Sequence, residues 1–167
     1  MSRWREPRPI SSAYITPQGY SRLEVELKEL WKRRAEVTLA VTAAAAEGDR
    51  SENAEYIYRK KELRSIDSRI GYLQKRMPDL TIVSSVNNDS QIFFGAWVTL
   101  EDDNSNQMRY RIVGADELSH GENRISLDSP LGSVLIGKSC DEEVNLNIGG
   151  RAQNYYIVAI NYESEEE

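Results

Sequence analysis

The segment Glu47-Gly48-Asp49-Arg50-Ser51-Glu52-Asn53-Ala54-Glu55-Tyr56 separates two stretches of the chain that share one hydrophobic spacing. Before it, side chains of one helical face recur at alternating steps of four and three residues: Leu23, Leu27, Leu30, Arg34, Val37, Val41 and Ala44. After it, the same spacing runs through Tyr56, Arg59, Leu63, Ile66, Ile70, Leu73 and Met77. Each run is a heptad seam, through which two helices pack. Folding the chain back at residue 50 superimposes the seams, which predicts one antiparallel hairpin with Asp49 and Glu52 at its apex.

Local signals predict the limits of this hairpin. Thr16 precedes Pro17, and a hydroxyl residue followed by proline is typical of a helix start, because proline has no N–H to leave unpaired there. We expect one helix from there to about residue 46 and another from about residue 51 to 77, closed by Pro78. The coiled coil thus covers residues 16–78, with its acidic tip at 47–56. Residues 1–15 show no periodicity and are predicted to form a flexible extension.

Composition excludes several classes of protein. No apolar run approaches the roughly 20 residues that a membrane span needs, and the N-terminus lacks the apolar core of a secretory signal. A single cysteine, Cys140, rules out a disulfide within the chain and suits a reducing compartment. We therefore expect a cytoplasmic protein that does not associate with membranes.

Charge is unevenly distributed along the chain. Residues 16–78 carry thirteen Lys and Arg against ten Asp and Glu, whereas residues 79–167 carry five against sixteen, a net charge of −11. A basic arm on an acidic body suggests that the arm meets nucleic acid or an acidic channel. On charge alone, solvated helix faces and a solubilising acidic tail at residues 163–167 explain the pattern equally well.

After Pro78 the hydrophobic period becomes that of β-strands. We expect strands at residues 81–85, 92–100, 108–113 and 124–127, then a short helix from Ser129-Pro130 to about Lys138. Residues 142–148 and 154–161 would form a closing hairpin across Gly149-Gly150. The prediction is an α+β protein whose second domain, residues 79–162, is small and antiparallel.

The chain has no complete catalytic site that we can identify. With one histidine, His120, and one cysteine, it cannot form a His/Cys metal cluster, and it has no phosphate-binding glycine loop. Asp49 and Glu52, three residues apart, are suitable ligands for Mg²⁺, but two carboxylates alone make a weak site. They would complete a metal site that belongs to a partner.

The same two acids have a purely structural interpretation. Asp49 and Glu52 also fit a capping box for the second helix, and Ser51 is a competing N-cap. Capping would turn the carboxylates onto their own backbone, whereas insertion into a partner needs at least one of them to point outward. The sequence leaves both interpretations open.

Basic residues along the arm are candidate nucleic-acid contacts. Arg33, Lys60, Lys61 and Arg64 can follow a phosphate backbone, although solubility of the helix surface explains them as well. Arg34 and Arg59 interrupt the apolar seams. Their alkyl stems are expected to pack while the guanidinium groups reach solvent, and a role in fixing register is the alternative.

Several segments together resemble the bacterial Gre transcript-cleavage factors, most closely their B-type members. They are Ile15-Thr16-Pro17-Gln18-Gly19-Tyr20, Gly48 to Tyr56, Phe93-Phe94-Gly95-Ala96-Trp97-Val98, Arg111-Ile112-Val113-Gly114 and Ile125-Ser126-Leu127-Asp128-Ser129-Pro130. They stand in family order over residues 14–162. The resemblance implies an N-terminal antiparallel coiled coil followed by an FKBP-like domain, the fold of FK506-binding prolyl isomerases.

The resemblance also implies a function. Family members bind bacterial RNA polymerase as monomers and insert the coiled coil into its secondary channel, where the polymerase itself cleaves the 3′ end of backtracked nascent RNA. Asp49 and Glu52 match the tip acids that help to hold Mg²⁺ in the polymerase active site, with Ser51 and Asn53 in support. The resemblance implies that the protein is not itself an enzyme and binds no cofactor of its own. The implied RNA-binding stripe is Arg33, Arg34, Lys60, Lys61 and Arg64.

The sequence departs from the family pattern at two places. Leu39 and Ala40 stand where B-type members can carry basic residues, and the arginine-containing segment before residue 14 does not match the pattern.

One alternative function is a non-catalytic regulator that occupies the polymerase channel. The other is a prolyl isomerase, suggested by fold analogy alone.

Overall fold

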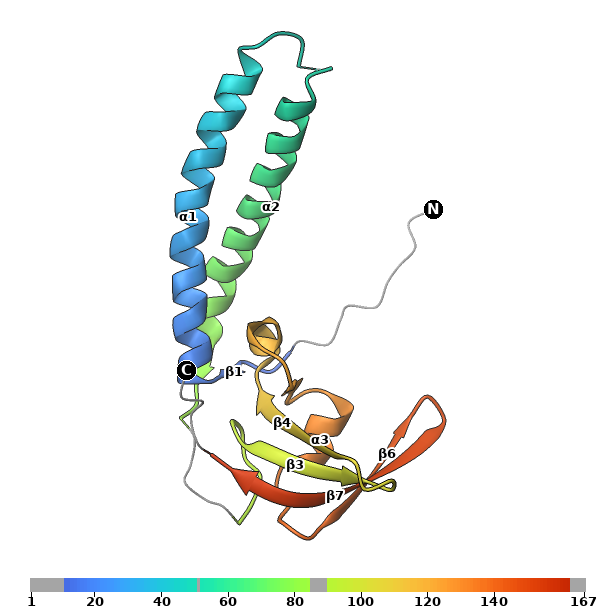
Figure 1. Cartoon of the computed structure of the whole chain (residues 1–167). Helices are drawn as coiled ribbons and strands as arrows, with labels where there is room; N and C mark the ends of the chain where they lie inside the picture. Colours follow the sequence, from blue (N-terminus) through green and yellow to red (C-terminus); the bar gives the residue numbers. More distant parts are fainter. Residues whose placement is uncertain (1–10, 51, 85–89, 163–167) are drawn as a thin grey trace, which may run out of the picture. The chain divides into compact units, whose positions relative to one another are not determined.

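The computed structural model describes residues 11–50, 52–84 and 90–162, which divide into two compact units (Figure 1). One unit is Tyr20–Leu80; the other combines the chain before residue 20 with the chain after residue 80. The first is helical and the second is built on a sheet, so the predicted α+β class is confirmed. None of the described helices is both long enough and apolar enough to cross a bilayer.

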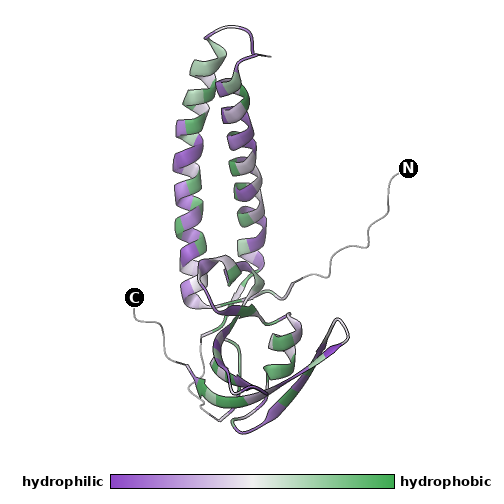
Figure 2. Cartoon of the chain, turned by 45° about the vertical axis from the view of Figure 1, so that its right-hand side comes forward, coloured by the Kyte–Doolittle hydropathy of each residue, from purple (hydrophilic) through white to green (hydrophobic). Residues whose placement is uncertain are grey.

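The helical unit is a hairpin of α1 (Pro17–Ala45) and α2 (Ala54–Arg76), followed by the 3₁₀ turn η1 (Met77–Asp79). Buried Val37, Ile66 and Ile70 pack with half-buried seam residues of both helices, which are Leu27, Leu30, Val41 and Leu63. Leu23 and Leu73 are fully buried near the base. Figure 2 shows that α1 becomes mainly hydrophobic toward the tip, where the sequence is rich in alanine. The two helices therefore meet along the seam that the spacing predicts.

Ion pairs across the hairpin show its antiparallel register. Glu26 of α1 pairs with Arg69 of α2 at 2.6 Å, and Arg33 pairs with Glu62 at 2.6 Å. Moving seven residues along α1 thus moves the partner seven residues back along α2. This opposite progression confirms the predicted fold-back of the chain.

The start of α1 is built as its sequence predicts. The Thr16 hydroxyl accepts a hydrogen bond from the Gly19 N–H at 3.0 Å, which caps the helix, and Pro17 is its first residue. Thr16 is itself held by Glu117, whose fully buried carboxylate accepts from the Thr16 N–H (3.1 Å) and the Thr16 hydroxyl. The same carboxylate accepts from the Gly114 N–H at 3.0 Å. One buried acid therefore holds Thr16 and Gly114 together within the sheet-containing unit, a role that the sequence analysis missed.

The second unit contains a five-stranded sheet in the order β5-β4-β3-β7-β6. The elements of this unit from residue 97 on are β3 (Trp97–Asp102), β4 (Gln107–Val113), η2 (Ala115–His120), β5 (Arg124–Ser126), α3 (Pro130–Leu135), β6 (Glu143–Ile148) and β7 (Arg151–Asn161). One face of the sheet forms the core with Leu135 of α3, through buried side chains that include Val98, Leu100, Ile112, Ile157 and Ile160. The core residues of β3 are two apart, whereas Ile157 and Ile160 of β7 are three apart because the pairing of β3 with β7 shifts register between Thr99 and Leu100.

The sheet is mostly, but not wholly, antiparallel as we predicted. β4 and β5 pair in parallel. The chain between them passes through η2 and returns to the end of the sheet at which β4 begins, so that β5 runs in the same direction as β4. A second parallel pair joins β1 (Tyr14–Ile15) to β2 (Thr81–Ile82). The prediction of a flexible extension through residue 15 is therefore wrong for its last residues, since Ile15 is fully buried. A two-residue strand is too short to produce a periodic pattern. Residues 1–10 and the predicted tail at 163–167 lie outside the described residues.

Two predicted strands are shorter in the structure. The strand expected from residue 92 begins only at Trp97, because Gly95 has a φ of 87° and turns the chain immediately before it. The strand expected from residue 81 ends at Ile82. In both cases apolar residues lie outside the strand itself, Ile92, Phe93 and Phe94 before β3 and Val83 after β2, so hydrophobicity alone overestimates the strand.

Candidate functional site

The candidate site is the turn between α1 and α2. Gly48 has a φ of 135°, a conformation that residues with a Cβ rarely adopt, and it lies in open surroundings. Asp49 and Glu52 follow it, and both side chains are exposed. Ser51, which we predicted to support them, lies outside the described residues. The two acidic residues thus occupy the apex of the hairpin, as the sequence predicts.

Asn53 closes the turn through its side-chain amide. Its Nδ2 donates to the carbonyl oxygen of Ala44 at 2.8 Å, and its Oδ1 accepts from the Tyr56 N–H at 3.0 Å. Helix ends leave carbonyl groups unpaired at the C-terminus and N–H groups unpaired at the N-terminus. Asn53 therefore satisfies one such group at the end of α1 and another at the start of α2.

This geometry corrects the capping interpretation of the tip acids. The second helix begins at Ala54 rather than near residue 51, and its N-cap is Asn53. The capping box of Asp49 and Glu52 is therefore wrong, because both residues precede the cap. Asn53, predicted as a supporting contact of the acids, has a structural role of its own. The carboxylates of Asp49 and Glu52 are not committed to capping α2.

The tip carboxylates suit a hard cation but do not make a complete site. Mg²⁺ prefers oxygen ligands, and Asp49 and Glu52 supply them from exposed positions. Over residues 11–50, 52–84 and 90–162, no group of three or more His, Cys, Asp or Glu side chains is close enough to hold a metal. The residues fit a role as additional ligands to an ion that another molecule already holds.

Basic side chains surround the aromatic ring below the tip. The Arg50 guanidinium lies 5.9 Å from the centroid of the Tyr56 ring, and the Lys60 ammonium lies 5.4 Å from it. Such cation–π contacts restrain the cations over the ring. Lys60, one of the predicted RNA contacts, is therefore held against Tyr56 in the first turn of α2.

One side of the hairpin is a network of paired charges. Glu62 accepts from Arg33 across the hairpin at 2.6 Å and from Arg59 of its own helix at 3.0 Å, and Arg59 also pairs with Glu55 at 2.7 Å. The hydrogen bond from Arg33, followed by that from Arg59, lowers the pKa of Glu62, and the bond to Glu62 raises the pKa of Arg33. The Glu26–Arg69 pair continues this side toward the base. We call these residues the paired side.

The predicted RNA-binding stripe is divided by this network. Arg33 belongs to the paired side, and Arg34 donates from Nε to Asp67 across the hairpin at 2.6 Å. The bond of Arg34 to the opposite helix favours the register role that we left open for the seam arginines. Lys61 and Arg64 are exposed at the surface. The structure thus places the five stripe residues in two different environments.

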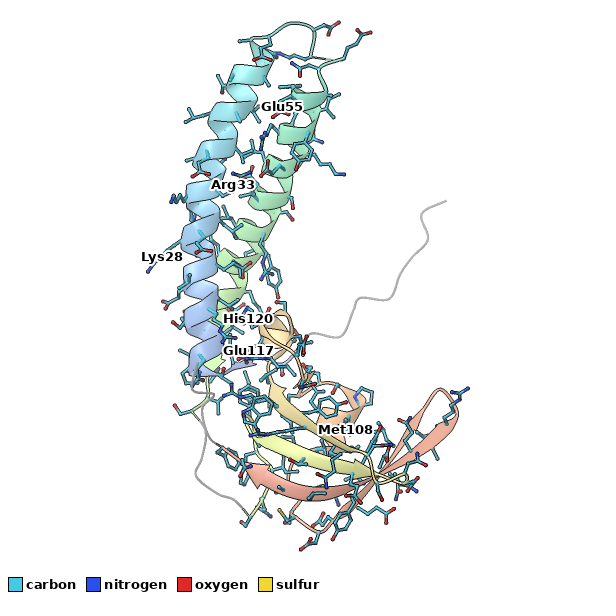
Figure 3. The ribbon with its side chains drawn as sticks, in the orientation of Figure 1. Lys28, Arg33, Glu55, Met108, Glu117 and His120 are labelled. Carbon is cyan, nitrogen blue, oxygen red and sulfur yellow. The ribbon has the colours of Figure 1, made fainter. Side chains whose placement is uncertain are left out.

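Two further lysines extend the exposed part of the stripe. Lys28 and Lys32 are exposed, and by heptad position they lie on the outer surface or on the opposite side of the seam from the Arg33–Glu62 pair, as do Lys60, Lys61 and Arg64. In Figure 3, Arg33 extends from α1 toward α2, whereas Lys28 extends away from α2. We call Lys28, Lys32, Lys60, Lys61 and Arg64 the basic side. Heptad position was the sequence signal that could have identified the two missed lysines.

Comparison with known proteins identifies the family of this chain. Residues 13–82 match the family described as "Transcription elongation factor, N-terminal", and residues 87–162 match "Transcription elongation factor, GreA/GreB, C-term". Transcription elongation factor GreB of Pseudomonas aeruginosa is 52% identical over 164 residues, which cover 97% of this chain and 98% of that protein.

Two further GreB proteins give the same result. GreB of Xanthomonas axonopodis pv. citri is 50% identical over 98% of this chain and 99% of its own, and GreB of Haemophilus influenzae is 49% identical over 91% and 98%. Among solved structures, Thermus aquaticus Gfh1 is 25% identical over 90% of this chain and 99% of its own, with a TM-score of 0.43. On the sequence matches, the chain belongs to the GreA/GreB family of transcription elongation factors and is of the GreB type.

Proposed function

We propose that this transcription elongation factor inserts its hairpin into the secondary channel of bacterial RNA polymerase and stimulates the polymerase's own cleavage of backtracked RNA. Removal of the extruded 3′ end would allow an arrested complex to resume synthesis. The chain would act in the cytoplasm as a monomer. In this proposal it is not an enzyme by itself, because the bond is broken in the active site of its partner.

The observation that carries the proposal is the placement of Asp49 and Glu52. Both carboxylates are exposed at the apex of the hairpin, and Asn53 provides the cap that they would otherwise be needed for. Exposed acids on an arm whose described residues form no metal site suit insertion into a site completed by another molecule. The basic side of the hairpin adds a surface that attracts the RNA phosphates.

Each tip acid has a definite role in this proposal. Mg²⁺ in the polymerase active site supplies Lewis-acid activation of water and of the phosphodiester. Asp49 and Glu52 would hold this ion through their carboxylate oxygens and would accept hydrogen bonds from the attacking water. The side-chain Nδ2 of Asn53 donates to the backbone carbonyl oxygen of Ala44 at 2.8 Å, and this bond holds the turn that carries both acids.

The test is RNA cleavage in a stalled, backtracked elongation complex that contains Mg²⁺. We expect the intact chain to accelerate release of the 3′ fragment, and Asp49→Ala/Glu52→Ala to lose the acceleration while still binding polymerase. Glu47→Gln is the matched control, because Glu47 is an exposed acid of the same turn and is not assigned a role.

The contrary result would favour a different function. Equal cleavage with the intact chain and the double variant, each bound to polymerase, would contradict the role of the acids. If both proteins bound and slowed RNA synthesis, a non-catalytic channel regulator would explain the chain better.

A further inference from the structure

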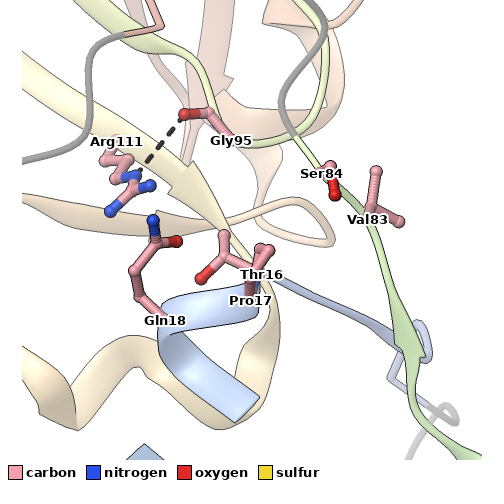
Figure 4. Close-up of a pocket in the computed structure, with 7 residues that line it drawn as sticks. All are labelled: Thr16, Pro17, Gln18, Val83, Ser84, Gly95 and Arg111. Carbon is pink, nitrogen blue, oxygen red and sulfur yellow. Dashed lines mark hydrogen bonds between the residues drawn. The ribbon is translucent and has the colours of Figure 1, made fainter. Parts of the chain in front are cut away.

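Two cavities of the sheet-containing unit are too small to enclose a nucleotide or a ligand of similar size. The first has a volume of about 80 Å³ and is lined by Thr16, Pro17, Gln18, Val83, Ser84, Gly95 and Arg111 (Figure 4). The second has a volume of about 130 Å³ and is lined by residues 102–104 and 152–155. Sites that enclose small molecules usually measure about 300–1,000 Å³. An aromatic ligand would therefore need an open surface rather than either of these cavities.

The hairpin presents an open aromatic surface at Trp31 of α1. This tryptophan is 46% exposed, and the Arg34 guanidinium lies 5.7 Å from the centroid of its ring. Arg34 is itself held from α2, because its Nε donates to Asp67 at 2.6 Å. The cation therefore restrains the indole ring, while nearly half of the residue remains accessible.

Trp31 lies on the basic side of the hairpin. Arg33 and Glu62 of the paired side occupy heptad position g, whereas Trp31 occupies position e, on the other flank of the seam. Lys28, which extends away from α2 in Figure 3, is three residues before Trp31, so the two side chains are neighbours on α1. The register that places Glu62 opposite Arg33 also places Arg64 close to the level of Trp31. The exposed ring therefore has a cation beside it on each helix.

Positive charge exceeds negative charge on this side of the helices. At heptad positions e, b and f, the acidic residues are Glu24 and Asp67 and the basic residues are Lys28, Lys32, Lys60, Lys61, Arg64 and Lys75. Asp67 is already paired with Arg34, which reduces its repulsion of an anion. A chain of phosphates is therefore attracted to the surface around Trp31.

This combination suits single-stranded nucleic acid better than it suits a protein partner. Proteins that bind single strands combine cations that follow the phosphates with aromatic rings on which bases stack. Every base has a π-face, so such stacking requires no particular sequence. The centres of protein interfaces are instead depleted of charged residues, whereas Trp31 has charged residues on both helices around it.

The position of Trp31 along the hairpin predicts which RNA can reach it. Trp31 is fourteen residues before Ala45, the last residue of α1, and this distance is about 21 Å at the rise of an α-helix. A strand with stacked bases advances about 3.4 Å per nucleotide, so about six nucleotides cover that distance. An RNA end that passes the tip by two nucleotides or so would not reach the ring.

We propose that Trp31 is a stacking platform for a base of the extruded RNA 3′ end, with Lys28 and Arg64 binding the neighbouring phosphates. This inference rests on the proposed function and adds a dependence on RNA length to it. Trp31 binds RNA far from the bond that is cleaved, so it holds long extruded ends and makes no contact with short ones.

The first test measures binding of single-stranded RNA to the intact chain without polymerase. The probe is a labelled oligouridylate of about ten nucleotides, within the range of sites that single-strand binders occupy, and its fluorescence anisotropy reports binding. Trp31→Leu should weaken binding at least about fivefold, the loss typical of one stacked base, while circular dichroism shows the helices retained. Equal affinity of the intact chain and Trp31→Leu, including failure of both to bind, would overturn the proposal.

Tyr72→Leu is the matched control. Tyr72 is 44% exposed and lies 5.3 Å from the guanidinium of Arg69, so it resembles Trp31 in exposure and in its neighbouring arginine. Arg69 pairs with Glu26, however, and so belongs to the paired side of the hairpin. Tyr72→Leu should therefore change the affinity for the oligouridylate by less than about twofold. A loss as large as that of Trp31→Leu would contradict a specific role of Trp31.

A salt series separates stacking from attraction between charges. Trp31→Leu should lower the affinity at every salt concentration and leave the dependence of log affinity on log salt unchanged, because tryptophan carries no charge. Lys28→Gln and Arg64→Gln should each reduce that slope by about 0.7, the value for one phosphate contact on a single strand. A reduced slope for Trp31→Leu would show that the ring acts only through the cations, which would contradict stacking.

Cleavage in backtracked complexes tests the predicted dependence on length. Trp31→Leu should slow stimulated cleavage severalfold when about ten nucleotides are extruded and leave it unchanged when about two are. Equal slowing at both lengths would contradict the assignment.

Failure of the proposed function can be distinguished from failure of this inference. If the intact chain did not stimulate cleavage, the proposed function would be wrong, whereas the oligouridylate titration would still decide whether Trp31 stacks on a base. If Trp31→Leu bound the oligouridylate normally and bound RNA polymerase without RNA more weakly, Trp31 would contact the polymerase. That outcome would overturn the proposal.

Discussion

The side chain of Asn53 donates a hydrogen bond to the carbonyl oxygen of Ala44, nine residues earlier in the chain, at 2.8 Å. This bond joins the last turn of α1 to the residue that caps α2. It explains how a long hairpin can end in a turn whose acidic side chains remain exposed. The Asn53 amide holds the turn, and neither tip acid is the N-cap of α2.

Replacement of Asn53 by alanine removes both hydrogen bonds of its side chain. We expect a loss of about 1–2 kcal/mol in the stability of the hairpin, the usual cost of losing an N-cap. Asn53→Asp should lose less, because aspartate still accepts from the Tyr56 N–H but cannot donate to Ala44. Urea unfolding followed by circular dichroism measures both. Equal stability of Asn53→Ala and the original protein would contradict the capping role.

Neutralising one tip acid tests the proposed chemistry with a minimal change. Asp49→Asn should reduce stimulated RNA cleavage by roughly 10²- to 10³-fold, the loss typical of one electrostatic contact in a catalytic site. Binding to RNA polymerase should change little, because the substitution is small and exposed. Cleavage rates at saturating factor measure the effect. A parallel loss of affinity would mean that the tip is mainly a docking element.

The two sides of the hairpin should respond differently to loss of charge. Replacement of Lys61 and Arg64 by alanine removes exposed cations of the basic side, so cleavage of long extruded RNA should weaken and depend less on salt. Arg33→Ala removes a cation that already pairs with Glu62, so it should affect RNA less and hairpin stability more. Cleavage rates measured over a series of salt concentrations compare the Lys61/Arg64 variant with Arg33→Ala. Equal effects on RNA would contradict the distinction between the sides.

The paired side predicts a dependence of stability on acid. Arg33 and Arg59 lower the pKa of Glu62 in the folded chain, so folding favours the ionised form. The resulting stabilisation is complete above the ordinary carboxyl pKa of about 4.5 and is lost as pH falls through the lower folded value. Glu62→Gln should therefore reduce the difference in unfolding midpoint between pH 6 and the range below about pH 4.5. An unchanged pH profile would show that Glu62 does not contribute.

Gly19 is predicted to tolerate no side chain. A Cβ there would lie 2.1 Å from Oε1 of the buried Glu117, so Gly19→Ala should destabilise the protein by about 1–3 kcal/mol, as overpacking does. Gly71→Ala is the control, because that helical position has no atom within 4 Å of the added Cβ. It should stabilise the protein by about 0.5–1 kcal/mol. Thermal unfolding of both variants measures the contrast, and similar destabilisation by the two would contradict it.

Local pattern was enough to predict the helical hairpin, its register and the location of the acids. The spacing of residues such as Leu30, Val37 and Ile66 repeats over many turns, and a long repeat specifies which face of a helix is buried. Thr16 and Pro17 act on residues next to them in the chain, so their effect can be predicted without knowing the fold. The predicted strands were correct in kind for the same reason, although their ends were not.

Tertiary structure decided which polar side chains form ion pairs and hydrogen bonds with distant parts of the chain. Arg33 looks like a surface cation in the sequence, but Glu62 lies 29 residues away and becomes its partner only when the helices meet. Glu117 binds Thr16 across 101 residues, and no local pattern marks either as a member of a pair. The pairing of β4 with β5 likewise depends on the path of η2. Hydrophobic periodicity is a local property of the chain, whereas the partner of a charge or a buried carboxylate is determined by the folding of distant segments.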